Sequence, residues 1–189
     1  MCQLSIASSR TSVLNLDNVG VALRVSEVHI LVVDDFEPWR RIVCSALRSW
    51  PELKVIAEAS DGVEAIQKAK ELQPDLILLD IGLPKLTGIE VARRIRNLVP
   101  RTEIIFLSQE TSADVIGEAL SLGARGYVAK AHAGGELVTA VKAVIQGRQF
   151  VSTGLARRRC WHGRILCQVC HRRPAAPGAT SKMKGYRGP

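Results

Sequence analysis

The stretch that decides the fold is LILLDIGLPKLTGIEVARRIRNLV at residues 76–99. Its first four residues are apolar without a break, which is the pattern of a strand buried on both faces of a sheet. Asp80 ends this strand. Apolar residues then return at helical spacing, at Ile89, Ala92, Ile95 and Val99. A doubly buried strand followed by an amphipathic helix predicts a parallel sheet covered by helices.

The alternation of short apolar runs and helical stripes continues on both sides of this stretch. Strands are predicted at 29–33, 55–59, 76–79, 104–107 and 126–129. Helices are predicted after them, at 39–50, 63–72, 89–99, 115–122 and 137–145. The stripe of the first helix comprises Trp39, Ile42, Val43, Ala46, Leu47 and Trp50. Because parallel neighbours need right-handed crossovers, the expected class is α/β, a doubly wound five-stranded parallel sheet with helices on both faces.

Charge divides the chain into three parts. Nine of the 26 Lys and Arg residues lie in 156–189, where there is no Asp or Glu, so the rest of the chain is close to neutral. We expect an irregular extension at 1–28, a folded domain at 29–155 and a disordered basic tail at 156–189. The sequence has no run of 18 apolar residues and no secretory signal pattern near its start. These features favour a cytoplasmic protein without a membrane span.

Charged and hydroxyl side chains follow several of the predicted strands. They are Asp34, Asp35, Asp80, Ser108 and Lys130. The carboxyl ends of parallel strands share one edge of the sheet, which is where open α/β sheets bind ligands. Three neighbouring carboxylates repel one another unless a cation such as Mg²⁺ neutralises them. Since Lys130 and Ser108 would add a positive charge and a hydroxyl for phosphoryl oxygens, the sequence predicts phosphoryl transfer to a carboxylate here.

Other phosphate chemistry is disfavoured. The chain has neither G-x-G-x-x-G nor the P-loop motif, so it offers no cradle for a dinucleotide or a nucleoside triphosphate. A haloacid-dehalogenase-type phosphatase would need a second Asp two residues after its nucleophile. Gly82 stands in that place after Asp80, and Phe36 and Glu37 follow Asp35.

Four segments together resemble the receiver domain of two-component response regulators. They are VVDD at 32–35, LLDIGLPKLTGIE at 78–90, FLS at 106–108 and GARGYVAK at 123–130. The resemblance covers 29–155 and implies a flavodoxin-like fold. It also implies a signalling domain rather than an enzyme, one that takes a phosphoryl group from a histidine kinase.

The resemblance assigns the phosphorylation site residue by residue. Asp80 would be the phosphoacceptor, and Lys130 would contact a phosphoryl oxygen. Asp34, Asp35 and Asp80 would form the Mg²⁺ site, with the backbone carbonyl of Gly82 as a further ligand.

The resemblance also implies a switch. Ser108 would be the switch hydroxyl, and Tyr127 would be the aromatic residue that moves inward on activation, although Tyr127 also fits an ordinary strand position. The surface built from the fourth helix, the fifth strand and the fifth helix would then change its contacts, by forming a homodimer or by docking a partner.

The end of the chain departs from this family. GGELVTAVKAVIQGRQFVSTGLA at 134–156 resembles the last helix and exit strand of receivers that carry a LuxR-type helix-turn-helix domain, but the 33 residues that follow are too few for its about 60 residues. The tail has three interpretations: a disordered extension, a nucleic-acid-binding segment with Trp161 and Tyr186, or a metal site. The metal site would use Cys160, His162, Cys167, Cys170 and His171. We interpret the C-x-x-C-H match at 167–171 as chance, because haem attachment requires export.

Overall fold

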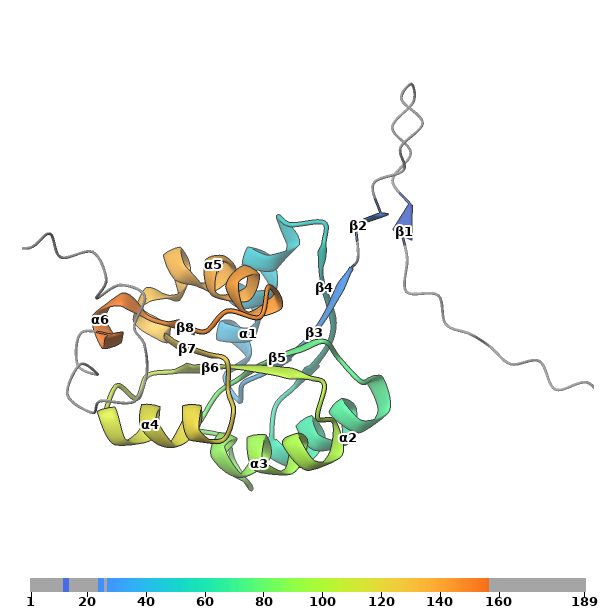
Figure 1. Ribbon diagram of the computed structural model, residues 1–189. Helices are drawn as coiled ribbons and strands as arrows, with labels where there is room; N and C mark the ends of the chain where they lie inside the picture. Colours follow the sequence, from blue (N-terminus) through green and yellow to red (C-terminus); the bar gives the residue numbers. More distant parts are fainter. Residues whose placement is uncertain (1–11, 14–23, 26, 157–189) are drawn as a thin grey trace, which may run out of the picture.

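A parallel sheet of six strands forms the centre of the domain (Figure 1). The computed structural model describes residues 12–13, 24–25 and 27–156. The strands pair in the order β4-β3-β5-β6-β7-β8, and every neighbouring pair in this sheet is parallel. Their bounds are β3 (Val28–Val33), β4 (Leu53–Ala59), β5 (Leu76–Leu79), β6 (Glu103–Ser108), β7 (Gly126–Ala129) and β8 (Phe150–Val151).

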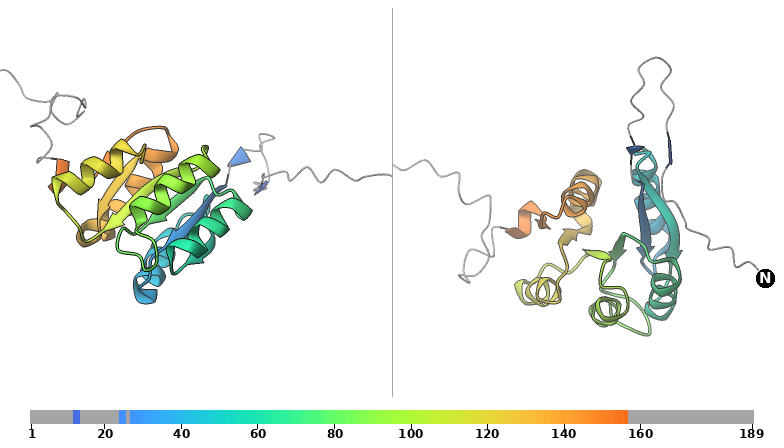
Figure 2. Two further views of the ribbon diagram at one scale, coloured as in Figure 1. Left: turned by 90° about the horizontal axis from the view of Figure 1, so that it is seen from below. Right: turned by 45° about the vertical axis from the view of Figure 1, so that its right-hand side comes forward.

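Helices cover both faces of the sheet, so the predicted doubly wound α/β fold is confirmed. Helices α1 and α5 lie on one face, and α2, α3 and α4 lie on the other (Figure 1, Figure 2). Their bounds are α1 (Glu37–Arg48), α2 (Gly62–Leu72), α3 (Gly88–Leu98), α4 (Ala113–Ser121) and α5 (Ala133–Ile145). A short 3₁₀ turn, η1 (Lys130–His132), precedes α5, and a short helix, α6 (Thr153–Ala156), follows β8.

Two apolar clusters hold the layers together, one on each face of the sheet. The cluster under α2, α3 and α4 contains Leu31 and Ile77, and the cluster under α1 and α5 contains Ile30 and Leu76. Neighbouring residues of one strand thus enter opposite clusters, because side chains alternate across a sheet. All four residues of β5 are fully buried. This two-sided burial explains why the run at 76–79 is continuously apolar.

Polar residues begin the three helices of one face. The Asp61 carboxylate accepts the N–H groups of Val63 and Glu64 at the start of α2. Thr87 forms a reciprocal capping box with Glu90 at the start of α3, and Ser112 caps α4. Each cap satisfies N–H groups that have no partner within the helix. The caps therefore fix where the loops beyond β4, β5 and β6 end.

The sheet has one strand more than the sequence predicted. The short strand β8 lies along β7, where the Phe150 N–H donates to the Arg125 carbonyl and the Ser152 N–H donates to the Tyr127 carbonyl, both at 2.9 Å. Leu155, just beyond it, is buried in the cluster under α4. The paired segment is too short to give a periodic signal, so periodicity predicted only five strands and the exit strand was expected from the resemblance at 134–156 alone.

In α1 the apolar stripe is wider than the buried face. Val43, Cys44 and Leu47 are buried, as the stripe predicted for two of them, but Ile42 is 57% exposed and Trp50 is 39% exposed. Among the described helices only α5 shares this face of the sheet with α1, and of these two side chains Trp50 is partly covered by the Lys142 ammonium of α5, 3.2 Å from its ring centroid. Ile42 and Trp50 thus belong to the predicted apolar stripe but not to its buried face.

Short strands lie in the described part of the predicted N-terminal extension. Within the extension, β1 (Ser12–Val13) pairs antiparallel with β2 (Arg24–Val25), and β3 begins at Val28. The tail beyond 156, with its candidate metal ligands and nucleic-acid contacts, lies outside the described residues. Across the described ranges, no helix has the length and apolar character needed to cross a membrane.

Candidate functional site

The candidate site lies where the order of the strands reverses. The strand β3 pairs with β4 on one side and with β5 on the other, so the crossovers leave the sheet toward opposite faces and a crevice remains at the carboxyl ends. Asp34 and Asp35 follow β3, and Asp80 follows β5. A cavity of about 820 Å³ opens at this edge, lined by Asp35, Asp80, Ser108 and Lys130 among others. The cavity is therefore lined by four of the five strand-end residues that the sequence singled out, and the fifth, Asp34, directly precedes Asp35.

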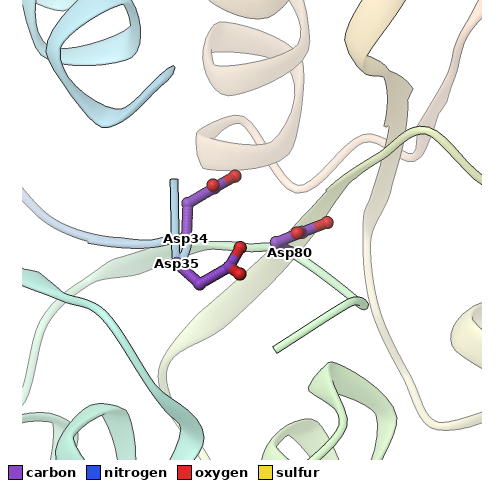
Figure 3. Close-up of side chains that lie close together, drawn as sticks. All are labelled: Asp34, Asp35 and Asp80. Carbon is purple, nitrogen blue, oxygen red and sulfur yellow. The ribbon is translucent and has the colours of Figure 1, made fainter. Parts of the chain in front are cut away.

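The three carboxylates converge. One oxygen of each of Asp34, Asp35 and Asp80 lies within 4.8 Å of the others. Figure 3 shows the three carboxyl groups pointing to the same side of the sheet edge. Asp34 is 2% exposed and Asp80 is 6% exposed, whereas Asp35 faces solvent. Two acidic groups that have lost most of their water thus share one small volume with a third.

Lys130 bridges the two buried carboxylates. Its ammonium nitrogen lies 2.6 Å from Asp34 Oδ2 and 3.0 Å from Asp80 Oδ2. Burial alone would lower the pKa of Lys130, but the contacts with the two carboxylates outweigh burial and raise it above the ordinary value. The side chain is therefore charged at neutral pH and compensates part of the negative charge of the site.

Asp34 has the opposite balance. Burial raises the pKa of its carboxyl group, and the contacts with Lys130 and with the Phe36 N–H offset only part of that rise. The charge of Asp80 raises it further. Burial disfavours the charged form of Asp34, and an additional cation nearby would stabilise that charged form. Asp34 therefore favours metal binding at this edge.

The donors present fit a hard cation. Carboxylate oxygens from Asp34, Asp35 and Asp80 are the ligand type that Mg²⁺ prefers, and the exposure of Asp35 leaves room for water ligands. Gly82 lies beside them, since a Cβ placed on Gly82 would come to 3.6 Å from Asp80 Oδ2. The triad is the acidic arrangement typical of a receiver Mg²⁺ site.

Ser108 and Tyr127 meet through the backbone of one residue between them. The Ser108 hydroxyl accepts the N–H of Glu110 at 3.1 Å, and the Tyr127 hydroxyl donates to the carbonyl of Glu110 at 2.8 Å. Tyr127 is fully buried, so its ring already lies inside in this conformation, and burial raises its pKa to about 12. Glu110 thus connects the two predicted switch residues. Sequence reasoning missed it because a backbone contact leaves no signature in residue type.

The loop that follows Asp80 is held by close backbone packing. The Gly88 N–H donates to the Ile81 carbonyl at 2.9 Å, and a Cβ on Gly88 would come to 2.0 Å from the Asp80 carbonyl oxygen. Gly62 at the start of α2 packs in the same way, because a Cβ there would come to 2.8 Å from the Leu86 carbonyl oxygen. Only glycine fits at these two points. The loop beside Asp80 is therefore fixed between α2 and α3.

Trp39 is a second residue of the site that the sequence did not identify. It was predicted as part of the apolar stripe of the first helix, but its ring also lines the cavity beside Lys130. The Lys130 ammonium lies 5.7 Å from the centroid of this ring. Helical spacing places Trp39 on the apolar face of its helix. It cannot indicate that the Trp39 side chain reaches Lys130, 91 positions later in the sequence.

Comparisons with known proteins agree with this geometry. Residues 30–142 match the family model described as the response regulator receiver domain. The chain is 36% identical over 129 residues to the DNA-binding transcriptional activator DevR/DosR of Mycobacterium tuberculosis, which covers 68% of this chain and 59% of that protein. It is 32% identical over 126 residues to the transcriptional regulatory protein DegU of Brevibacillus brevis, covering 67% and 53%. The chain therefore spans between half and two thirds of these relatives.

A solved structure gives the same assignment. The crystal structure of a LuxR-family two-component response regulator from Aurantimonas sp. SI85-9A1 is similar, with a TM-score of 0.67 and 32% identity, over 70% of this chain and 94% of that one. The family match extends over more than half of the chain and encloses the acidic pocket. The chain thus belongs to the response regulator receiver domain family, the non-enzymatic phosphoacceptors of two-component systems.

Proposed function

We propose that Asp80 is the phosphoacceptor and that the chain receives a phosphoryl group from the phosphohistidine of a histidine kinase. The observation that carries this proposal is the position of Lys130, 3.0 Å from the buried Asp80 carboxylate at the centre of the acidic pocket. A carboxylate oxygen of Asp80 attacks phosphorus, an O–P bond forms and the N–P bond of the donor breaks. The departing imidazole nitrogen keeps the electron pair of that bond.

The remaining residues of the pocket receive the transferred group. Lys130 exchanges its contact with Asp80 for a phosphoryl oxygen, and its charge stabilises the oxygens as transfer proceeds. We propose that Asp34, Asp35, Asp80 and the Gly82 carbonyl hold Mg²⁺. When bound, the ion would neutralise the carboxylates and polarise the phosphoryl group.

Labelling with acetyl phosphate tests the phosphoacceptor. The full chain with Mg²⁺ should gain one phosphoryl group by intact-protein mass spectrometry, and Asp80→Asn should gain none. Asp114→Asn makes the same chemical change on the exposed first turn of α4 and should be labelled like the parent. Omitting Mg²⁺ should abolish labelling of the parent. Equal labelling of the parent and Asp80→Asn would refute the assignment.

We propose that phosphorylation is transmitted from Ser108 to Tyr127 through Glu110, in the loop that follows β6. A phosphoryl group offers the Ser108 hydroxyl a strong acceptor, and movement of this side chain toward it breaks the bond that the hydroxyl oxygen accepts from the Glu110 N–H. Because Glu110 also accepts from Tyr127, the change reaches the surface formed by α4, β7 and α5. Since β8 covers the edge of β7, a homodimer on this surface would use α4, α5 and β8.

Beryllofluoride, a phosphoryl mimic, tests the switch. Hydrogen exchange across 108–130 should change when the mimic binds, and sedimentation should report whether a dimer forms. Unchanged exchange with the mimic bound would refute the transmission step. An unchanged sedimentation coefficient would refute only the dimer.

A second function is suggested by the charge of the tail, which carries nine Lys and Arg residues and no acidic residue. We propose that it binds nucleic acid by non-specific electrostatic contact. The full chain should bind DNA with an affinity that falls steeply as salt rises, and the variant with Arg157, Arg158 and Arg159 replaced by Gln should show a smaller salt slope. Equal slopes would refute a role for these three residues. Neither result affects Asp80.

A further inference from the structure

Trp39 occupies an unusual position for a residue of an apolar helix face. Its ring packs at the margin of the cluster under α1 and α5, and it also lines the cavity that contains Asp80 and Lys130. The neighbouring ammonium of Lys130 lies 5.7 Å from the ring centroid, within the range of a cation–π attraction. The side chain of Lys130 is 11% exposed, so little water screens that attraction.

The indole nitrogen of Trp39 lowers the stability of the folded state. The Nε1 atom is buried, and among the described residues no group accepts its hydrogen. A buried donor without an acceptor destabilises the folded state. Phe would keep an aromatic ring at this apolar position without the unpaired donor. Packing alone therefore does not account for tryptophan here, whereas the indole ring is the side chain whose face attracts a cation most strongly.

An aromatic face beside Lys130 would matter most during phosphoryl transfer, when this lysine changes its partners. In the described state Lys130 is held by Asp34 and Asp80 on two sides. On the proposed function, Lys130 must release Asp80 and take a phosphoryl oxygen while Asp80 reacts. A neutral aromatic face attracts the ammonium throughout this exchange, and it competes neither for the metal nor for the phosphoryl group.

We propose that Trp39 is a positioning residue, whose ring holds the Lys130 ammonium beside the pocket while Asp80 is phosphorylated. This inference rests on the proposed function of Asp80. It predicts that reducing the ring to Phe lowers activity without lowering stability. Phe keeps a weaker cation-binding face and loses the unpaired donor, and Leu keeps only apolar bulk.

The test compares Trp39→Phe and Trp39→Leu in the full chain. At saturating acetyl phosphate and Mg²⁺, the maximal phosphorylation rate should fall in the order Trp, Phe, Leu, with about a three- to tenfold loss for Leu. The acetyl phosphate concentration that gives half the maximal rate should not change. Unfolding in urea should show Trp39→Phe to be at least as stable as the parent. A merely structural role predicts a rate that follows stability, which would overturn the proposal.

Two controls complete the experiment. Trp50 lies just after α1 under Lys142, with the ammonium 3.2 Å from its ring centroid, so Trp50→Leu removes another lysine–tryptophan contact, one outside the cavity, and should leave the rate unchanged. In a Lys130→Ala background, Trp39→Leu should have no further effect. An equal loss with and without Lys130 would refute the positioning role. A parent that is not labelled at all would instead refute the proposed function.

Discussion

Replacing Gly88 by Ala tests how closely the fold and the proposed phosphorylation site depend on each other. The added Cβ would come to 2.0 Å from the Asp80 carbonyl oxygen and to 2.8 Å from the Ile81 Cα, and both are backbone atoms. Real Cβ atoms essentially never approach closer than 3.0 Å, so the start of α3 or the end of β5 must move by about 1 Å. We expect overpacking of this kind to lower the free energy of unfolding by about 3 kcal/mol.

The atom met at 2.0 Å is the carbonyl oxygen of Asp80 itself, so relieving the clash displaces Asp80 relative to α3. A shift of about 1 Å in the reacting group can reduce the rate about a hundredfold, so labelling by acetyl phosphate should fall well beyond what the lost stability explains. Gly117→Ala is the matched control, because a Cβ on Gly117 in α4 has no atom within 4 Å. It should raise the free energy of unfolding by about 0.5–1 kcal/mol and leave labelling unchanged. Urea unfolding and labelling of Gly88→Ala that match the parent would refute the packing argument.

Three further predictions concern groups outside the acidic pocket. Burial opposes ionisation of Glu136, but hydrogen bonds from Ser152 and Thr153 outweigh burial and lower the pKa of Glu136 below 4.5. Its contribution to stability is present above that value and is lost as pH falls through the lowered pKa, so Glu136→Gln should destabilise the domain at pH 7 and much less in acid, as urea unfolding would show. Burial raises the pKa of Cys44 to about 11, and this thiol should resist iodoacetamide at pH 8 until the chain unfolds, as peptide mass spectrometry would reveal. Tyr127→Phe removes the bond to the Glu110 carbonyl and should cost about 1 kcal/mol in thermal or urea unfolding.

The sequence was a good guide wherever one-dimensional periodicity has a direct structural cause. The run at 76–79 predicted a strand buried on both faces, and its four residues are fully buried. The convergence of Asp34, Asp35 and Asp80 was predicted from topology alone, because the carboxyl ends of parallel strands share an edge. The short strand β8 has two paired residues and therefore no period, so only the resemblance at 134–156 implied an exit strand there.

Contacts between distant side chains could not be predicted in this way. Nothing in the sequence indicates that Lys130 pairs with Asp34 as well as with Asp80, because that depends on how η1 directs the side chain across the sheet edge. The same holds for the backbone of Glu110. Its N–H and its carbonyl each make one hydrogen bond, and both depend on the course of the loop after β6. The exposure of Ile42 is a packing outcome, since a stripe shows which side of a helix is apolar but not how much of it a neighbour covers.

The parallel direction of β8 determines where the described chain enters and leaves the domain. β3 enters the sheet at its amino edge, and β8 leaves it at the carboxyl edge, the edge at which Asp80 lies (Figure 1). Had the last strand run antiparallel, the chain would have returned to the side from which it entered. A fluorophore or a fused domain joined before residue 27 therefore starts at the edge remote from the phosphorylation chemistry, whereas one joined after residue 156 starts at the reactive edge. Reporters of kinase contact belong at the second junction, and purification handles belong at the first.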